Sequence, residues 1–509
     1  MLNQFKNRDL VDRISRGQET PEVAVNFLMS QKSGVAPEWE HLKKEWDSNT
    51  HPAILRAKQM RVDNPDRQVP NIGLSDQERY TQRAIDLMFS KPVTREWETE
   101  NPDGSIDKVK ADIAKTIESV LLQNAYDSLN RERFVPYFAS CQMAVVWESF
   151  QKTDRNGTPI KQKYGDKLSD YKIACKVYSP MNGDSIHPVY DDKGKLVLLG
   201  IGYSSMVYGT QESFFTILSS FGVQTFLTSD GSWVSANEGG NIVATEIGKI
   251  PGAFIERNAP VWRKTSGITY EKEHKIIDNG MLIDYNSVPD RVVKIEGDSQ
   301  DEEMEALQIQ MGIARRLPDG TVEIIPPEER KKKPSFSRNY MGKGISMAIQ
   351  EWSGATDALQ YHMKTLQDLQ DNDIGLPDLA PNAIANIGED TLRLILKVSA
   401  LRVVTESGKA EHFMRREINV IKEHIKQMYP RSRWSIIDDL EFKVQINPFQ
   451  ITNDKEEVEI SLLENGNMPL RSWESSVKKR LNPKEFKGNW EQLQEENRNQ
   501  TQTEQGNLL

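Results

Sequence analysis

Apolar residues recur at steps of three and four along two stretches of this chain, 345–370 and 389–429. This spacing places an apolar stripe along one side of a helix, so the pattern predicts two long helices. The second helix would be longer than an ordinary globular helix, and Ser407 followed by Gly408 marks an expected kink in it. It should stop before Pro430, because proline cannot continue a helix.

The segment between these helices, 371–387, cannot be helical throughout, because it contains Gly375, Pro377 and Pro381. The sequence therefore predicts a loop. Two interpretations remain open: an ordinary connection between packed helices, or a loop that projects from a helical stalk into a channel shared by several copies. The loop is also acidic, with aspartates at Asp371, Asp373 and Asp378.

The first half of the chain changes from helical to strand-like patterning. Ser75, followed three residues later by Glu78, is typical of a helix N-terminus, and helices are expected at 75–90, 107–130 and 134–140. From 143 to about 260, alternating and β-branched residues predict strands. The expected strands are 143–150, 171–178, 186–190, 196–208, 224–228, 233–235 and 250–256, with hairpin turns at 191–194 and 229–231.

The remaining elements are shorter, and together they indicate an α+β protein of several domains. A helix is expected at 269–288 and a strand at 440–446. Residues 1–74 predict an irregular arm with short helices, and the polar stretch 491–509 predicts a disordered tail. Further short elements are expected as strands at 309–314 and 321–325 and as helices at 453–463 and 470–481.

The distribution of apolar residues also indicates whether the chain spans a membrane or is secreted. It has no run of about 18 or more apolar residues, so no transmembrane helix is expected. The N-terminus has no apolar segment of the kind that a signal peptide requires. Cys141 and Cys175 lie in apolar surroundings and are expected to be buried thiols in a reducing compartment.

Sequence motifs of catalysis, metal binding and nucleotide binding are missing. Gly342-Lys343-Gly344 lacks the upstream glycine and the following hydroxyl of a phosphate-binding loop. The seven histidines form no pair with zinc-ligand spacing, and there is no nucleophile elbow. We therefore expect no catalytic residues, no metal and no cofactor, although an enzyme whose site follows no motif stays an alternative.

The charged residues argue against one mode of DNA binding and indicate one candidate binding surface. The chain has a net charge of -10, which argues against tight, nonspecific DNA binding through a broad basic face. Two basic groups nevertheless stand beside turns and prolines. They are either solvated loop residues or a patch that docks a partner or faces phosphate. Their members are Arg315, Arg316, Arg330, Lys331, Lys332 and Lys333.

The order of these elements resembles the portal proteins of tailed double-stranded DNA bacteriophages, of the long-tailed siphovirus type. A capped helix that ends in Ser90-Lys91-Pro92-Val93-Thr94 is similar to the start of those proteins, and the strand at 143–150, the two hairpins and the short strand at 250–256 follow in the same order. The broken helix pair at 345–429 resembles their stem and tunnel helices. The strand at 440–446, followed by the sequence at 447–475, resembles their return strand and crown.

The resemblance covers almost the whole chain from about residue 75 and implies a ring, most often of twelve copies. The implied fold has a mixed α/β wing, a helical stem, a small clip and a helical crown. This chain differs in having no clearly basic tunnel helix in its sequence. The implied regions are an arm at 1–74, wing 75–265, stem helix 266–290, clip 291–338, stem or tunnel helix 339–371, tunnel loop 372–387, long tunnel helix 388–429, return strand 430–450, crown 451–490 and tail 491–509.

A portal of this type is a structural, non-enzymatic virion protein at one capsid vertex, assembled in the host cytoplasm. It forms the channel through which double-stranded DNA is packaged and ejected without sequence specificity, and it nucleates capsid assembly. Implied partners are terminase, head–tail connector or adaptor proteins, and the major capsid and scaffolding proteins, with no membrane. The clip residues expected to dock partners are the six basic residues named above. The expected channel residues are Asp371, Asn372, Asp373, Ile374, Gly375, Leu376, Pro377 and Asp378.

Two other interpretations remain from the sequence alone. The first is another head–tail structural protein of a virion, although adaptors of that kind are usually shorter. The second is a cytoplasmic enzyme of mixed α/β fold, which predicts a monomer or small oligomer with a defined pocket.

Overall fold

A computed structural model describes most of residues 8–447. The gaps within this range are 32–33, 64–68, 101–104, 155–156, 208, 237–242, 245–247, 287–290, 296–304, 306–307, 310–313, 327–344, 350–354 and 376–388. The expected crown at 451–490 and the expected tail at 491–509 lie outside the described residues.

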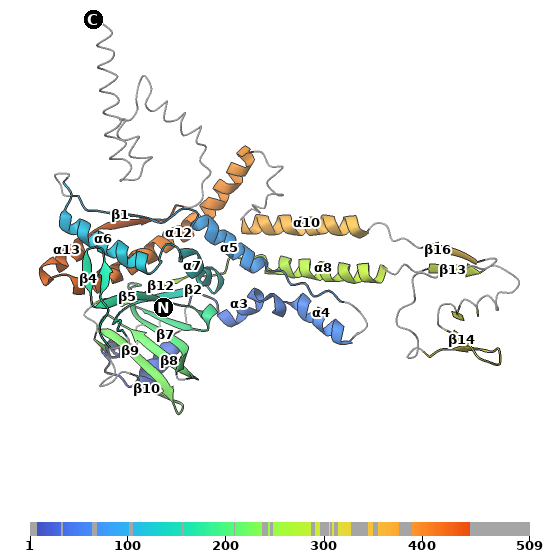
Figure 1. Cartoon of the computed structure of the whole chain (residues 1–509), viewed down its shortest axis with the longest axis horizontal. Coiled ribbons are helices and arrows are strands. Elements are labelled where there is room, and N and C mark those ends of the chain that lie inside the picture. Colours follow the sequence, from blue (N-terminus) through green and yellow to red (C-terminus); the bar gives the residue numbers. More distant parts are fainter. Residues whose placement is uncertain are drawn as a thin grey trace, which may run out of the picture.

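The described chain has a mixed body of helices and sheets from which a pair of helices extends to one side (Figure 1). The pair is α8 (Ser266–Asn286) and α10 (Ala355–Ile374), which lie side by side. Two small strand pairs lie at their far end. The expected α+β class is therefore confirmed.

The main core of the body lies between a three-stranded sheet and four helices. The sheet has the order β12-β2-β5 and is antiparallel throughout. Trp147 of β2 and Phe413 of α12 are 0% and 2% exposed, and Phe413 contacts Phe134 edge to face. The elements of this core are α5 (Asp76–Met88), α6 (Lys108–Gln123), α7 (Asn130–Ala139), α12 (Glu389–Ile425), β2 (Gln142–Gln151), β5 (Tyr171–Tyr178) and β12 (Gly252–Glu256).

A second sheet has the strand order β10-β9-β8-β7-β6, with β11 paired to β9. Both expected hairpins are confirmed. In the second, Asp230 and Gly231 have φ angles of 51° and 80°, the left-handed backbone that a two-residue hairpin turn requires. The strands are β6 (Ser185–Tyr190), β7 (Leu196–Val207), β8 (Thr210–Leu218), β9 (Gly222–Ser229), β10 (Ser232–Ser235) and β11 (Val243–Ala244).

The first 74 residues contain the short helices that the sequence predicts, and these pack tightly on the rest of the chain. The helices α1 (Arg8–Ser15) and α2 (Pro21–Ser30) bury apolar side chains against the second sheet. The helices α3 (Trp39–Trp46) and α4 (Pro52–Asp63) lie on the side of α8. A Cβ at Gly280 of α8 would lie 2.2 Å from Pro70, so glycine permits this close approach.

Strand β1 (Thr94–Trp97) pairs with β17 (Phe442–Gln445), which lies near the other end of the described chain. The expected strand at 440–446 is thus confirmed, whereas no strand was predicted at β1. Smaller elements complete the body: β3 (Gln162–Tyr164), β4 (Lys167–Ser169) and α13 (Trp434–Asp439), with 3-10 turns η2 (Ser48–Thr50), η3 (Pro180–Asn182), η4 (Lys426–Met428) and η5 (Arg431–Arg433).

One helix is predicted over 345–370, but the first residues of this range form a strand. Strand β16 (Ile345–Ile349) pairs with β13 (Arg291–Ile295), and α10 begins only at Ala355. Four of these five residues are apolar, a run that fits a helix and a short strand equally well, so a distant partner decides between them. The region boundary that placed a helix over 339–371 is wrong for the same reason.

Three further predictions of local structure are also corrected. The expected helix at 107–130 ends at Gln123, and Ala125 has a left-handed φ of 49° before α7 starts. Ser75 precedes α5, but its side chain makes no capping hydrogen bond. In the distal hairpin, β14 (Ala314–Arg316) pairs with β15 (Val322–Ile324). The first strand was predicted at 309–314, but Ile309 is helical and β14 begins only at the last residue of that range.

The expected long helix is confirmed, since α12 is helical through Ser407 and Gly408 to Ile425. Whether it bends there stays a prediction. Within the described part of the chain, every helix is too short or too polar to cross a membrane.

Replacing Phe413 by alanine should lower the free energy of unfolding by about 3–5 kcal/mol, because it removes a buried aromatic ring from the main core. Leu122→Ala is the matched control, since Leu122 is 80% exposed and its loss should change stability by less than about 0.5 kcal/mol. Urea denaturation followed by circular dichroism measures both. Equal midpoints for the two variants would contradict this description of the core.

Candidate functional site

The extended pair of helices is the most distinctive feature of the described chain, and its inner side follows helical spacing. Leu366, Gln370 and Ile374 of α10 are four residues apart and buried. Tyr361 and Leu369 of the same helix are 76% and 51% exposed. Large apolar side chains in this position indicate that α10 has an outer surface which a single chain leaves uncovered.

A buried lysine joins the two helices to the body. The ammonium group of Lys272, on α8, donates hydrogen bonds to Asp76 Oδ2 at 2.9 Å, Gln367 Oε1 at 2.7 Å and Gln370 Oε1 at 2.8 Å. These use all three of its N–H donors. The amide of Gln370 donates in turn to Asp76 Oδ2 and to Thr269 Oγ1. One polar cluster therefore ties together α5, α8 and α10.

The charges in this cluster keep Asp76 ionised. Burial by itself raises the pKa of Asp76, but the positive charges of Lys272 and Arg79 and the hydrogen bond from Gln370 outweigh it, and the pKa is lowered. Lys272 and Asp76 are 5% exposed, so the pair is shielded from water and salt. A buried pair of this kind fixes the position of its helices more than it adds to their stability.

Asp371, one of the residues predicted to line a channel, belongs to the last turns of α10 and binds α5. Its carboxylate accepts hydrogen bonds from Tyr80 Oη at 3.1 Å and Gln367 Nε2 at 2.8 Å, and Arg83 lies 3.4 Å away. Burial, followed by the charge of Asp371, raises the pKa of Tyr80 well above its ordinary value. The prediction that Asp371 lies in a loop is therefore wrong.

The other expected channel residues divide into two groups. Asn372, Asp373 and Ile374 also lie in α10, and Ile374 is buried at 9% exposure. Gly375 ends the helix with a φ of 63°. The loop thus starts four residues later than predicted, at Gly375. Leu376, Pro377 and Asp378 lie outside the described residues.

A second buried contact fastens the N-terminal segment to α8. His51 Nδ1 lies 2.7 Å from Glu273 Oε1, and His51 Nε2 lies 2.8 Å from the carbonyl oxygen of Glu45. Both ring nitrogens face acceptors, an arrangement that a doubly protonated, positively charged ring satisfies. Burial lowers the pKa of His51, but the hydrogen bonds to Glu273 and Glu45 and the charges of Glu273 and Asp47 outweigh burial and raise it.

A third buried pair fixes α12 in the body. The guanidinium group of Arg133 donates to both carboxylate oxygens of Glu417, at 3.0 and 2.8 Å. Tyr126 Oη donates to the same carboxylate at 2.6 Å, and its ring lies 3.9 Å below the guanidinium. Glu417 therefore accepts three hydrogen bonds from Arg133 and Tyr126 in the core.

The distal hairpin carries two of the predicted basic residues. Arg315 on β14 forms an ion pair with Glu323 on β15 at 2.7 Å, and Arg316 lies opposite Val322. Both side chains are exposed. The structure thus places Arg315 and Arg316 together at the far end of the extended helices (Figure 1). Arg330, Lys331, Lys332 and Lys333 lie outside the described residues.

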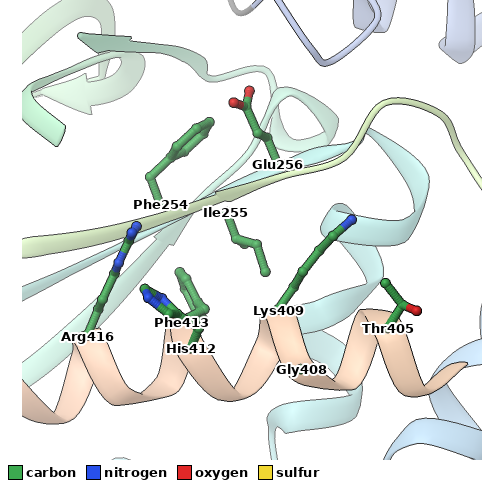
Figure 2. A pocket seen from close by; sticks show the side chains of 9 residues that line it. All are labelled: Phe254, Ile255, Glu256, Thr405, Gly408, Lys409, His412, Phe413 and Arg416. Carbon is green, nitrogen blue, oxygen red and sulfur yellow. The ribbon is translucent and has the colours of Figure 1, made fainter. Parts of the chain in front are cut away.

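An open hollow lies where α12 passes β12 (Figure 2). Its cavity volume is about 530 Å³. Figure 2 shows the side chains of Lys409, His412 and Arg416 along the near side of the helix, with Glu256 across the hollow. Sequence spacing contained this signal, since positions 408, 409, 412, 415 and 416 fall on one side of a helix. The hollow is lined by Phe254, Ile255, Glu256, Thr405, Gly408, Lys409, His412, Phe413 and Arg416.

Neither cysteine forms a disulfide. Cys141 is buried and Cys175 half-buried, and burial raises the pKa of the first thiol to about 12 and of the second to about 11. The described residues bring together no group of three or more histidine, cysteine, aspartate or glutamate side chains that could hold a metal ion.

Comparisons with known proteins return distant structural likenesses. No protein-family model matches the sequence, and no curated protein matches it. A chain from the neck of a native gene transfer agent particle, computed with C12 symmetry, is 10% identical with a TM-score of 0.37, covering 89% of this chain and 96% of that one. A chain from the virion of a native particle is 10% identical with a TM-score of 0.35, covering 88% and 96%.

A chain from the neck of an empty gene transfer agent particle, computed with C6 symmetry, is 11% identical with a TM-score of 0.38. The likeness covers 80% of this chain and 90% of that one.

The His51–Glu273 contact predicts a specific dependence of stability on pH. The pKa of His51 is raised above its ordinary value of 6.5, so its stabilisation is complete below that pH and is lost as the pH rises through the folded-state pKa. The melting temperature of the wild type should therefore fall more than that of His51→Gln between about pH 5.5 and about pH 8.5. All other titrating groups are shared, so parallel pH profiles would refute the charged state of His51.

Proposed function

We propose that this chain is a portal protein of a tailed double-stranded DNA phage, of the long-tailed siphovirus type, and forms a ring of twelve copies at one capsid vertex. In this proposal the ring is a channel through which DNA is packaged and ejected, and it also nucleates capsid assembly. The protein is then a structural component of the virion that assembles in the host cytoplasm. Its role is non-enzymatic.

The observation that carries the proposal is the extended pair α8 and α10 with strands at its far end (Figure 1). One chain gains little by holding two helices away from its own core, because their outer sides stay in water. A ring of copies supplies a neighbour for each pair. The exposed side chains of Tyr361 and Leu369 on α10 support such packing, since association would bury them.

The charge of the chain supports passage of DNA without adhesion. Each copy carries -10, so a ring of copies is strongly acidic and repels phosphate. A channel with this property lets DNA slide, because few basic side chains replace its counterions. We place the constriction at the segment between Gly375 and Glu389, which includes Leu376, Pro377 and Asp378 of the predicted loop.

Anchoring of α10 supports this assignment of the constriction. Asp371 binds Tyr80 and Gln367, and Ile374 is buried, so the end of the helix is held by the body up to Gly375. A loop that starts from a fixed helix end projects from a defined point. Its position then depends on the Lys272 cluster, which fixes α10 against α8.

The distal hairpin is the proposed docking place for terminase and for the head–tail connector proteins. It lies at the end of the extended helices, farthest from the body (Figure 1). Arg315 and Arg316 are exposed there, and positively charged side chains at an exposed tip steer acidic partners towards it. The basic residues Arg330 to Lys333 belong to the same proposed clip.

Purified protein viewed by negative-stain microscopy tests the proposal directly. We expect rings with a central hole, and a sedimentation coefficient that fits an assembly of about twelve chains rather than one of 58.1 kDa. A compact monomer or dimer would refute the portal and favour an enzyme of mixed fold. A filament or a small assembly that joins preformed rings would favour another head–tail structural protein.

The docking role of the tip predicts that Arg316→Glu weakens binding of terminase and connector proteins to the ring roughly fivefold, about 1 kcal/mol, since one exposed charge is reversed. Arg316 is preferable to Arg315, because Arg315 also pairs with Glu323 within the hairpin. Lys193→Glu, in an exposed turn of the body, is the control. Unchanged binding to Arg316→Glu rings, measured by surface plasmon resonance, would remove the tip from the docking surface.

A further inference from the structure

One side of α12 is exposed and divides into an apolar part and a basic part. Leu401 and Val404 are 62% and 51% exposed near its start. Further along the same side, Lys409, His412, Arg415 and Arg416 are all exposed. These positions fall within one stripe at 100° per residue, whereas the opposite side of the helix is buried in the main core. We call the four basic residues the α12 basic face.

Like charges crowd this face. His412 lies three residues from Lys409 and Arg415 and four from Arg416, which are neighbour positions on a helix. Burial lowers the pKa of His412, and the charges of Arg416 and Arg415 lower it further. The negative groups near it include Glu256 across the hollow (Figure 2). On α12 itself they include Glu411, four residues before Arg415, and Glu406, which pairs with Lys409 at 3.3 Å. Arg415 and Arg416 gain most from an acidic partner outside the chain.

The sheet of β1 and β17 presents the opposite charge. Glu96, Glu98 and Glu100 alternate along one exposed side of the first strand and its continuation, and Glu441 is exposed beside them. The register pairs Glu96 with Lys443, and one step further the amide of Glu98 donates to the carbonyl of Glu441 at 3.0 Å. Two glutamates thus lie directly opposite each other. We call these four residues the glutamate face.

Glutamates opposite one another across a strand pair repel and destabilise it unless a cation lies between them. In the strand register, Lys443 lies opposite Glu96 and not opposite Glu98. Arg95 lies on the other side of the sheet and forms ion pairs with Glu118 and Asp127. It therefore cannot relieve the repulsion between the glutamates. The α12 basic face therefore has an excess of positive charge, and the glutamate face has an excess of negative charge.

We propose that the α12 basic face of one copy binds the glutamate face of the next copy. The contact is heterologous, because it uses two different surfaces of the same chain, and repeated head to tail it generates a closed ring when its rotation fits. This inference rests on the proposed ring. It adds the two surfaces that meet and the charges that align them.

A second copy fits the α12 face better than a nucleic acid does. The exposed side chains of Leu401 and Val404 continue the same stripe and give it an apolar part. Phosphate backbones offer nothing to apolar side chains, whereas a protein surface covers them. The chain itself supplies a complementary acidic surface, so no outside partner is needed.

Charge reversal in both faces, separately and together, tests the contact. Arg415→Glu with Arg416→Glu should lower the fraction of protein in rings about tenfold at low salt, and Glu98→Lys with Glu441→Lys should do the same. Mixed together, or joined in one chain, the two pairs restore opposite charges and should recover ring formation. Lys193→Glu with Lys195→Glu changes the net charge equally in an exposed turn and should leave rings unaffected.

Native mass spectrometry and negative-stain microscopy at several salt concentrations measure the outcome, and circular dichroism confirms that each variant is folded. Rings that persist in both reversed pairs would overturn this contact and leave the portal proposal standing. Loss of rings in each pair without recovery in the combination would also overturn it. Absence of rings in the wild type would instead refute the portal itself. Rings that form normally but lose DNA retention in Arg415→Glu with Arg416→Glu would assign the face to nucleic acid.

Discussion

The placement of the extended helices depends on one buried ammonium group. Lys272 donates to Asp76, Gln367 and Gln370, and so connects three helices that lie far apart in the sequence. Apolar contacts alone would let α8 and α10 slide, because such contacts have no direction. Three hydrogen bonds from one charged group, closed off from water, allow only one arrangement. The cluster therefore fixes the direction in which α8 and α10 leave the body.

Patterns with local causes were predictable from the sequence. Both hairpins follow from turn residues such as Asp230 and Gly231, and α12 follows from apolar residues at steps of three and four. Patterns that depend on distant partners were not. Strand β16 looks like the start of a helix until β13 pairs with it, and β1 becomes a strand only because β17 returns beside it. The residues of one strand do not indicate which distant strand pairs with it.

The candidate site shows the same division. The basic character of Arg315 and Arg316 is visible in the sequence, although their position at the far tip is not. Asp371 is predicted to lie in a loop, but it belongs to α10, and Tyr80, almost 300 positions away, binds it to the body. His51 and Glu273 are 222 residues apart, and no residue beside either of them in the sequence indicates that they are in contact. Charge is evident from a sequence, whereas the partner of a charge is a property of the fold.

The pairing of β1 with β17 also sets an order of events during synthesis. Residue 94 leaves the ribosome about 350 residues before residue 445, its partner in the register. Until then β1 has no partner strand, and Glu441 does not yet exist beside Glu98. The glutamate face is thus one of the last described surfaces to be completed. A nascent chain cannot use it to join a finished neighbour, so the chain's own topology delays association until the body has folded.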